Sequence, residues 1–199
     1  MSSRRADSLL SWMYFIERFT LSRAWTELTD EEFFWEPFPG SWSVRRRSDC
    51  QTSMPFGSGD WVVDFDANVA AVRWTEPLTT VAWLMWHIGS MPGRAAQLEF
   101  LGGTQTADSG WTSPYVCDHP IFSSADEAVQ TLREGWRALG DALREASDEQ
   151  LETPTRFWGY GQPGPPAAAH QVLASVVNEV SHHATQIGVL RDLRRLGDG

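Results

Sequence analysis

The chain has 199 residues, and its 26 acidic side chains outnumber its 16 basic ones, which gives a formal charge of −10. This balance argues against a nucleic-acid binder held by a basic surface and against a polybasic membrane anchor. Apolar residues make up 42% and charged residues 21%, which is ordinary for a globular protein, and the length predicts a single domain over residues 1–199.

The sequence shows none of the apolar segments that direct a chain to or across a membrane. No apolar run approaches the roughly 20 residues that a membrane helix needs. The N-terminal residues 1–7 do not lead into the uninterrupted apolar stretch of a secretory signal. We therefore expect a cytoplasmic protein. The two cysteines, Cys50 and Cys117, have no ligand-like spacing, which favours free thiols.

Four segments have apolar residues spaced by threes and fours, the pattern of an amphipathic helix. The first runs over about residues 6–26 and is followed by a short capped helix near residues 28–32. The second begins near residue 78 and ends at residue 101, before two glycines, and Pro92 inside it predicts a kink or a break. The other two helices are predicted over about residues 123–147 and 167–196.

The connections between these helices are rich in proline and glycine. Residues 36–76 carry only weak strand signals, such as residues 61–65, so we predict a long structured loop there and another loop over 159–166. Four helices without a convincing sheet predict an all-α fold, a four-helix bundle. Because two connections are longer than an up-down-up-down bundle needs, we expect crossover (up-down-down-up) connections.

The fourth predicted helix carries a histidine where its packing pattern asks for an apolar residue. The apolar stripe passes from Val180 to Ile187 with one position skipped, and His183 occupies that position. Glu179 precedes it by four residues and therefore shares its face. Helical bundles build metal sites from such pairs. The alternative is a core histidine that is hydrogen-bonded to the carboxylate and binds no metal.

The second predicted helix offers a third ligand, His87, next to its own apolar stripe. His87, Glu179 and His183 would make a His₂Glu set, which leaves an open metal position for water or substrate. An ordinary half-buried histidine at a helix contact is the alternative for His87. The loop residue His119 and His170 show no partner pattern, and we expect both at the surface.

Three further residues are candidate contacts of a bound small molecule. Arg94 is seven residues beyond His87 and close to its face, where its guanidinium could bind a carboxylate. Trp83 is a candidate pocket wall. Gln186 stands about one turn beyond His183 and is a candidate partner of that imidazole. For each of the three, ordinary packing or solvent exposure is the alternative.

Several motifs carry a resemblance to a known family. Residues 40–45 (GSWSVR), residues 86–89 (WHIG) with Gly93 and Arg94 after them, and residues 179–193 resemble the DinB-like superfamily. They are most similar to its branch of mycothiol-dependent maleylpyruvate isomerase and mycothiol S-transferases. The resemblance spans nearly the whole chain. It implies a four-helix bundle with a divalent ion, zinc or nickel, held by His87, Glu179 and His183.

This resemblance implies a metal-dependent thiol transferase that acts in detoxification. A divalent ion held by two neutral imidazoles and one carboxylate keeps a net positive charge, which favours a bound thiolate. The expected cofactors are this ion and a low-molecular-weight thiol, mycothiol by resemblance, and the expected substrate is an electrophilic small molecule. Two alternatives stay open: a non-catalytic, metal-braced bundle that dimerises or binds small molecules, and a metallohydrolase using metal-bound water. The Trp-rich composition is compatible with a homodimer.

Overall fold

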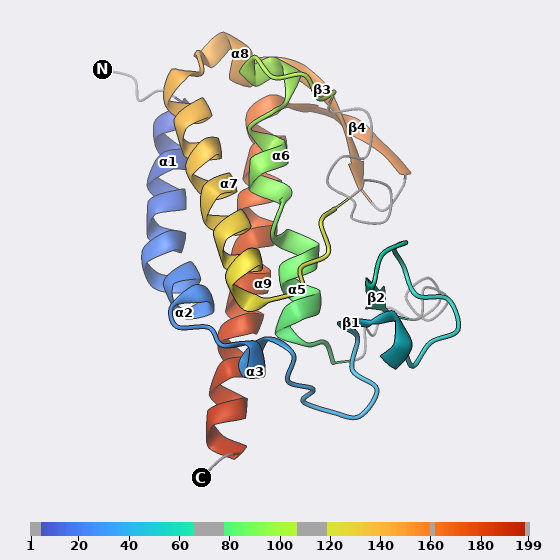
Figure 1. Cartoon of the computed structure of the whole chain (residues 1–199). Helices are drawn as coiled ribbons and strands as arrows, with labels where there is room; N and C mark the ends of the chain where they lie inside the picture. Colours follow the sequence, from blue (N-terminus) through green and yellow to red (C-terminus); the bar gives the residue numbers. More distant parts are fainter. Residues whose placement is uncertain (1–4, 66–77, 107–118, 160–161, 198–199) are drawn as a thin grey trace.

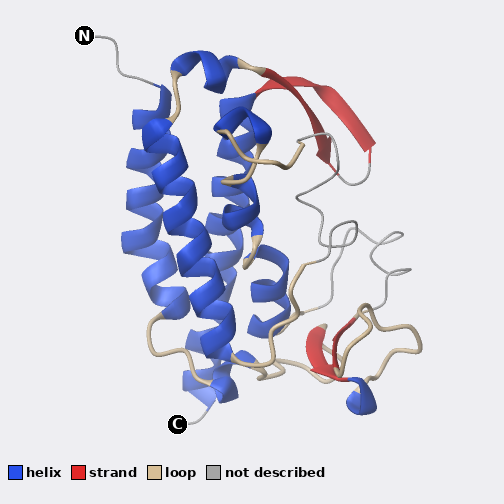
Figure 2. Cartoon of the chain, turned by 45° about the horizontal axis from the view of Figure 1, so that its top comes forward, coloured by secondary structure: helices blue, strands red, loops and turns tan. Residues whose placement is uncertain are grey.

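The computed structural model describes residues 5–65, 78–106, 119–159 and 162–197, and these residues are mostly helical with two small sheets (Figures 1 and 2). The first predicted helix is confirmed as one continuous helical segment. It consists of α1 (Arg5–Ile16), the π-helical turn η1 (Glu17–Leu21) and α2 (Ser22–Trp25). The short helix α3 (Asp30–Phe33) follows, and Thr29 and Glu32 form its capping box.

The second predicted helix is interrupted, as its sequence indicates. It consists of α5 (Val81–Ile88), α6 (Met91–Ala95) and the 3₁₀ turn η3 (Glu99–Leu101). The break falls between α5 and α6, just before Pro92 and not at it. Pro92 lies in the first turn of α6, where its missing N–H costs no helical hydrogen bond.

The third and fourth predicted helices are confirmed with bounds close to those expected. They are α7 (Ala125–Glu145), which Ser124 caps, and α9 (Ala169–Gly197). The short helix α8 (Asp148–Glu152) follows α7 and has a capping box of its own. None of the described helices is both long and apolar enough to cross a lipid bilayer.

The two predicted loops contain strands, so the expectation of a fold without sheet is wrong. Strands β1 (Ser43–Arg46) and β2 (Trp61–Asp64) form one antiparallel ribbon, and β3 (Pro154–Gly159) and β4 (Gln162–Ala168) form another. In a two-stranded ribbon each strand has a free edge, so a proline can face outward without losing a ladder hydrogen bond. This explains why a proline-rich segment forms β4. Residues 66–76 of the first predicted loop lie outside the described residues.

The long helices pack side by side (Figure 1). Helix α7 packs on α1 and α6, and α9 packs on α1, α2, α5 and α6. The backbones of α6 and α7 come into direct contact at Gly93 and Gly135. A Cβ atom on Gly135 would lie 2.7 Å from the Gly93 nitrogen, so this crossing requires glycine.

The β1–β2 ribbon is tied to the start of α5. The Trp42 backbone exchanges hydrogen bonds with Leu78 and Thr80, and the Ser43 hydroxyl contacts the Thr80 hydroxyl at 2.9 Å. Thr80 in turn caps α5 through the Trp83 N–H. The ribbon therefore fixes the N-terminal end of α5, the helix whose last turn carries the predicted ligand His87.

A buried carboxylate holds the ribbon together. Asp64 is 2% exposed and accepts hydrogen bonds from the backbone of Gln51 and Thr52, the Thr52 hydroxyl and the Arg45 guanidinium. Burial acts to raise the pKa of Asp64. The hydrogen bonds from Thr52 and Gln51 and the charge of Arg45 outweigh it, so the pKa lies below its usual value.

Candidate metal centre

The three predicted ligands come together where α5 packs against α9. His87 lies in the last turn of α5, and Glu179 and His183 lie one turn apart on α9. Oxygen Oε1 of Glu179 is 3.1 Å from His87 Nε2 and 3.2 Å from His183 Nε2. One ligand atom from each of the three residues lies within 4.8 Å of the ligand atoms of the other two. Within the described part of the chain, this group consists of these three residues.

The packing of both helices explains this convergence. Every residue of α5 except His87 is buried. The packing of these buried residues fixes the rotation of α5 about its axis and places the His87 imidazole beside α9. His183 is 7% exposed and occupies the skipped position between Val180 and Ile187, both of which are fully buried. The prediction that His183 replaces an apolar residue in the packing stripe is confirmed.

Neighbouring side chains restrict both imidazoles. The Trp83 ring stacks on His87 with an angle of 7° between the planes and 5.4 Å between the centroids. The amide oxygen of Gln186 lies 2.6 Å from His183 Nδ1. The two imidazole rings stand nearly perpendicular, with centroids 4.7 Å apart. Each ring therefore has a second contact that holds its Nε2 toward Glu179.

The hydrogen bonds keep Glu179 ionised. Contacts with His183 first and His87 second lower the pKa of this carboxyl far below its usual range, and they outweigh the burial that acts to raise it. The side chain of Glu179 is 43% exposed, whereas those of His87 and His183 are 14% and 9% exposed. The cluster is thus closed on the imidazole side and open to solvent on the carboxylate side.

The donor set fits a divalent ion such as zinc. Zinc in proteins is bound by imidazole nitrogen and carboxylate oxygen, and three such ligands are typical of a site with an exchangeable fourth position. One buried imidazole (His183), one half-buried imidazole (His87) and one ionised carboxylate supply these atoms. The hydrogen bond at His183 Nδ1 leaves its Nε2 as the ligand atom of that ring.

Two of the three predicted contact residues adjoin the cluster. Trp83 stacks on His87, and Gln186 contacts His183. Arg94 lies half-buried in α6, beyond the break that follows α5, and its binding role stays a prediction.

Sequence reasoning missed a contact close to His87 in the chain. His119 is 3% exposed, and its Nδ1 lies 3.0 Å from the hydroxyl of Ser90, which follows α5 directly. The expectation that His119 lies at the surface is therefore wrong. No periodic pattern could have indicated the pair, because His119 belongs to a loop. His170 is half-buried rather than exposed, and its Nδ1 lies 3.0 Å from the Leu151 carbonyl.

The cysteine in the described residues is a poor nucleophile. Cys50 is half-buried, and its sulfur lies 3.7 Å from the Arg46 carbonyl oxygen. Burial first, and then the charge of Asp64, raise the pKa of the Cys50 thiol. Little of this thiol is ionised at neutral pH. Cys117 lies outside the described residues.

Comparison with known proteins gives a family match. A family model described as the DinB superfamily matches residues 60–187. This range includes α5, α6, α7 and all three residues of the cluster, and it leaves α1, α2 and α3 outside. No curated protein and no solved structure gives a significant match.

Proposed function

Since the chain belongs to the DinB superfamily, which includes metal-dependent enzymes, we propose that it is a metal-dependent thiol transferase with His87, Glu179 and His183 as metal ligands. The convergence of these three side chains on one point is the observation that carries the proposal. In the reaction, the sulfur of a low-molecular-weight thiol forms a bond to an electrophilic carbon, and the thiol proton and the leaving group are released.

A divalent ion bound here would supply a positive charge that favours the thiolate over the thiol. The protein's own groups set the conditions for this. Glu179 stays ionised, Gln186 and Trp83 orient the imidazoles, and the exposed side of Glu179 leaves a route by which solvent and small molecules reach the cluster. This open side favours an enzyme over a metal that only braces the core.

We propose an external thiol as the nucleophile, because burial raises the pKa of Cys50 and keeps this residue in its less reactive thiol form. The resemblance of residues 86–89 and 179–193 to the mycothiol-dependent branch makes mycothiol the proposed thiol. Zinc is the proposed ion, with nickel as the second choice. The proposal also includes a four-helix bundle with crossover connections, since four helical segments pack side by side. It further includes a single domain that acts in the cytoplasm on a small electrophile.

Replacing one ligand tests the cluster directly. In His183→Ala we expect bound zinc, measured by inductively coupled plasma mass spectrometry after loading and desalting, to fall from about one ion per chain to near zero. His182→Ala is the matched control, because His182 is the adjacent, exposed residue of the same helix, and it should keep its metal. Equal metal content in both variants would refute the ligand assignment.

The same proteins test the reaction. The zinc-loaded protein is assayed with monobromobimane and, in turn, mycothiol, bacillithiol, glutathione and cysteine. We expect conjugation, with release of bromide, to be fastest with mycothiol and to be lost in His183→Ala. Flat rates across all four thiols, none of them above background, would point to a binding module. A zinc-dependent hydrolysis of test esters without any thiol would point to a metallohydrolase.

A further inference from the structure

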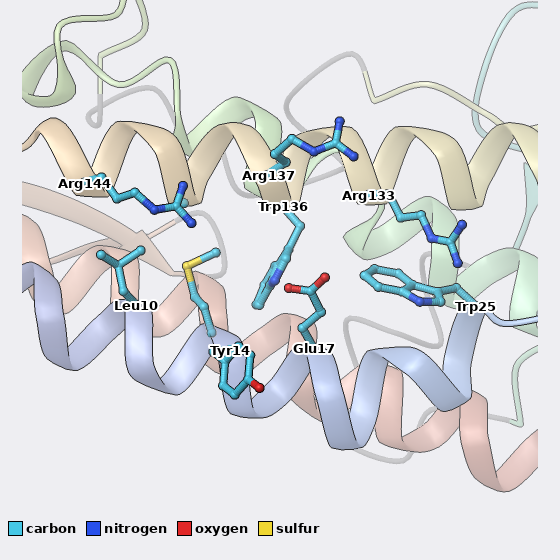
Figure 3. Close-up of a pocket in the computed structure, with 10 residues that line it drawn as sticks. Leu10, Tyr14, Glu17, Trp25, Arg133, Trp136, Arg137 and Arg144 are labelled. Atoms are coloured by element: carbon cyan, nitrogen blue, oxygen red, sulfur yellow. The ribbon is translucent and has the colours of Figure 1, made fainter.

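A groove of about 480 Å³ lies between α1 and α7, and its lining contains no residue of the His87–Glu179–His183 cluster. Helix α1 contributes Leu10, Met13 and Tyr14, and α7 contributes Trp136 at the centre (Figure 3). This volume lies within the range of small-molecule sites, which combine apolar walls with a few polar groups.

The polar groups of the lining are mostly cationic. Three arginines and one glutamate line the groove, which gives it a net charge of +2 in a chain whose formal charge is −10. Arg133 and Arg137 have no carboxylate partner within 4 Å among the residues that the structure describes, although acidic side chains outnumber basic ones in the chain. These two guanidinium groups are therefore available to an anion.

Two of the arginines are held in place before any ligand binds. The guanidinium of Arg133 lies over the Trp25 ring, 5.0 Å from its centroid. Arg144 forms an ion pair with Asp141, and its guanidinium nitrogens lie 3.8 Å from the position that a Cβ atom on Gly140 would occupy. In Figure 3 the Arg144 side chain extends along the groove toward Trp136, whereas Arg133 lies at the other end of the groove, beside Trp25. Because their positions are fixed, less entropy is lost when they bind a ligand.

Two residues shape the middle of the groove. Gly140 lies on α7 between Arg137 and Arg144 and has no side chain to fill the space there. Glu17 rises from η1 between Trp136 and Trp25 (Figure 3), and it makes no ion pair with the arginines of the groove. The apolar surface next to Gly140 is thus bordered by the guanidinium groups of α7.

We propose that this groove binds an amphipathic organic anion, a molecule with an apolar body and a carboxylate or phosphate head. The apolar body would lie on Leu10, Met13 and Trp136, and the head would bind the guanidinium groups. A guanidinium group can donate two parallel hydrogen bonds to two oxygen atoms of either a carboxylate or a phosphate. A second copy of the chain is a poorer occupant, because a two-fold axis through the groove would bring like-charged arginine rows together.

Isothermal titration with octanoate, octyl phosphate and octanol tests the proposal. We expect one molecule of either anion to bind per chain, at least about tenfold more tightly than octanol, and more weakly as the salt concentration rises. Stronger binding of octyl phosphate would assign a phosphate head, and stronger binding of octanoate a carboxylate head. Equal binding of octanol and both anions would overturn the proposal.

Matched variants locate the site. Arg137→Gln should weaken anion binding about tenfold, and Gly140→Leu, which fills the space between Arg137 and Arg144, should abolish it. Arg46→Gln is the control, because Arg46 is exposed like Arg137 and lies over a tryptophan ring like Arg133, but belongs to β1. Unchanged binding in both groove variants would overturn the assignment. A dimer detected by light scattering that dissociates in Arg137→Gln would also overturn the assignment. The groove would then be an interface between two copies of the chain. Neither titration nor light scattering depends on the metal or on transferase activity.

Discussion

Glu179 is the side chain on which the candidate metal centre depends most, because one of its oxygen atoms contacts both imidazoles. Its position one turn before His183 could be predicted from the helical period. The contact to His87 could not, because it depends on how α5 packs against a helix about 90 residues away in the chain. The sequence indicated the two histidines separately, and the fold places them 4.7 Å apart between ring centroids.

Gln186 provides a test at the same scale, because its amide oxygen contacts His183 Nδ1. We expect Gln186→Leu to lower the affinity for zinc about 10- to 100-fold, since the imidazole loses the partner that orients its Nε2. Gln186→Glu, which keeps an acceptor oxygen, should restore most of the affinity. Both are measured by competition with a zinc-binding dye. Thr185→Val, at the exposed neighbouring position, is the control, and equal affinities in all variants would contradict the positioning role.

At the scale of elements, the helices could be predicted well and the strands poorly. The four helices follow from apolar spacing and capping residues such as Ser124, whose side chain accepts from Glu127. The ribbon of β3 and β4 could not be predicted, because its prolines and glycines are also typical of loops. Its strands are stabilised by pairing with each other, which local composition does not report.

The crossing of α6 and α7 gives a test of packing at this scale. Gly135→Ala should lower the free energy of unfolding by about 1–3 kcal/mol, because the new methyl group meets the Gly93 backbone. Gly188→Ala is the matched control. Its Cβ would meet nothing within 4 Å, so the gain in helix propensity should raise stability by about 0.5–1 kcal/mol. Urea unfolding measures both, and the same sign for the two variants would contradict the close crossing.

At the scale of the whole molecule, the cluster and the groove use different parts of the chain. The cluster lies between α5 and α9 and falls within the family match, whereas the α1 side of the groove lies outside residues 60–187. The groove was not predicted from sequence, since its arginines on α7 have the spacing of any solvated helix face. That all three line one groove becomes visible only when α1 lies opposite them.

Acid should destabilise the whole fold through Asp64. Because its pKa is lowered in the folded state, its contribution to stability is complete above its unfolded pKa of about 3.9 and is lost as pH falls through the folded pKa. We expect the free energy of unfolding in urea to decrease below about pH 5. Asp64→Asn should cost about 2–4 kcal/mol at pH 7 and flatten this pH dependence, since it leaves Arg45 without its buried partner.

The control for this prediction is Asp60→Asn, which changes an exposed carboxylate close to β2. Its stability at pH 7 should stay within about 0.5 kcal/mol of that of the parent protein, and its acid dependence should be retained. An identical response of the two variants would show that the buried carboxylate is not the source of the pH dependence.

The placement of the three donor atoms on two separate helices has a thermodynamic consequence. An unfolded chain cannot offer them together, so a divalent cation held by all three would bind the folded state selectively, and by mass action its free concentration would set part of the folding equilibrium. A hundredfold excess over the dissociation constant adds about 2.7 kcal/mol. The melting temperature of this protein would then report the metal supply of its surroundings.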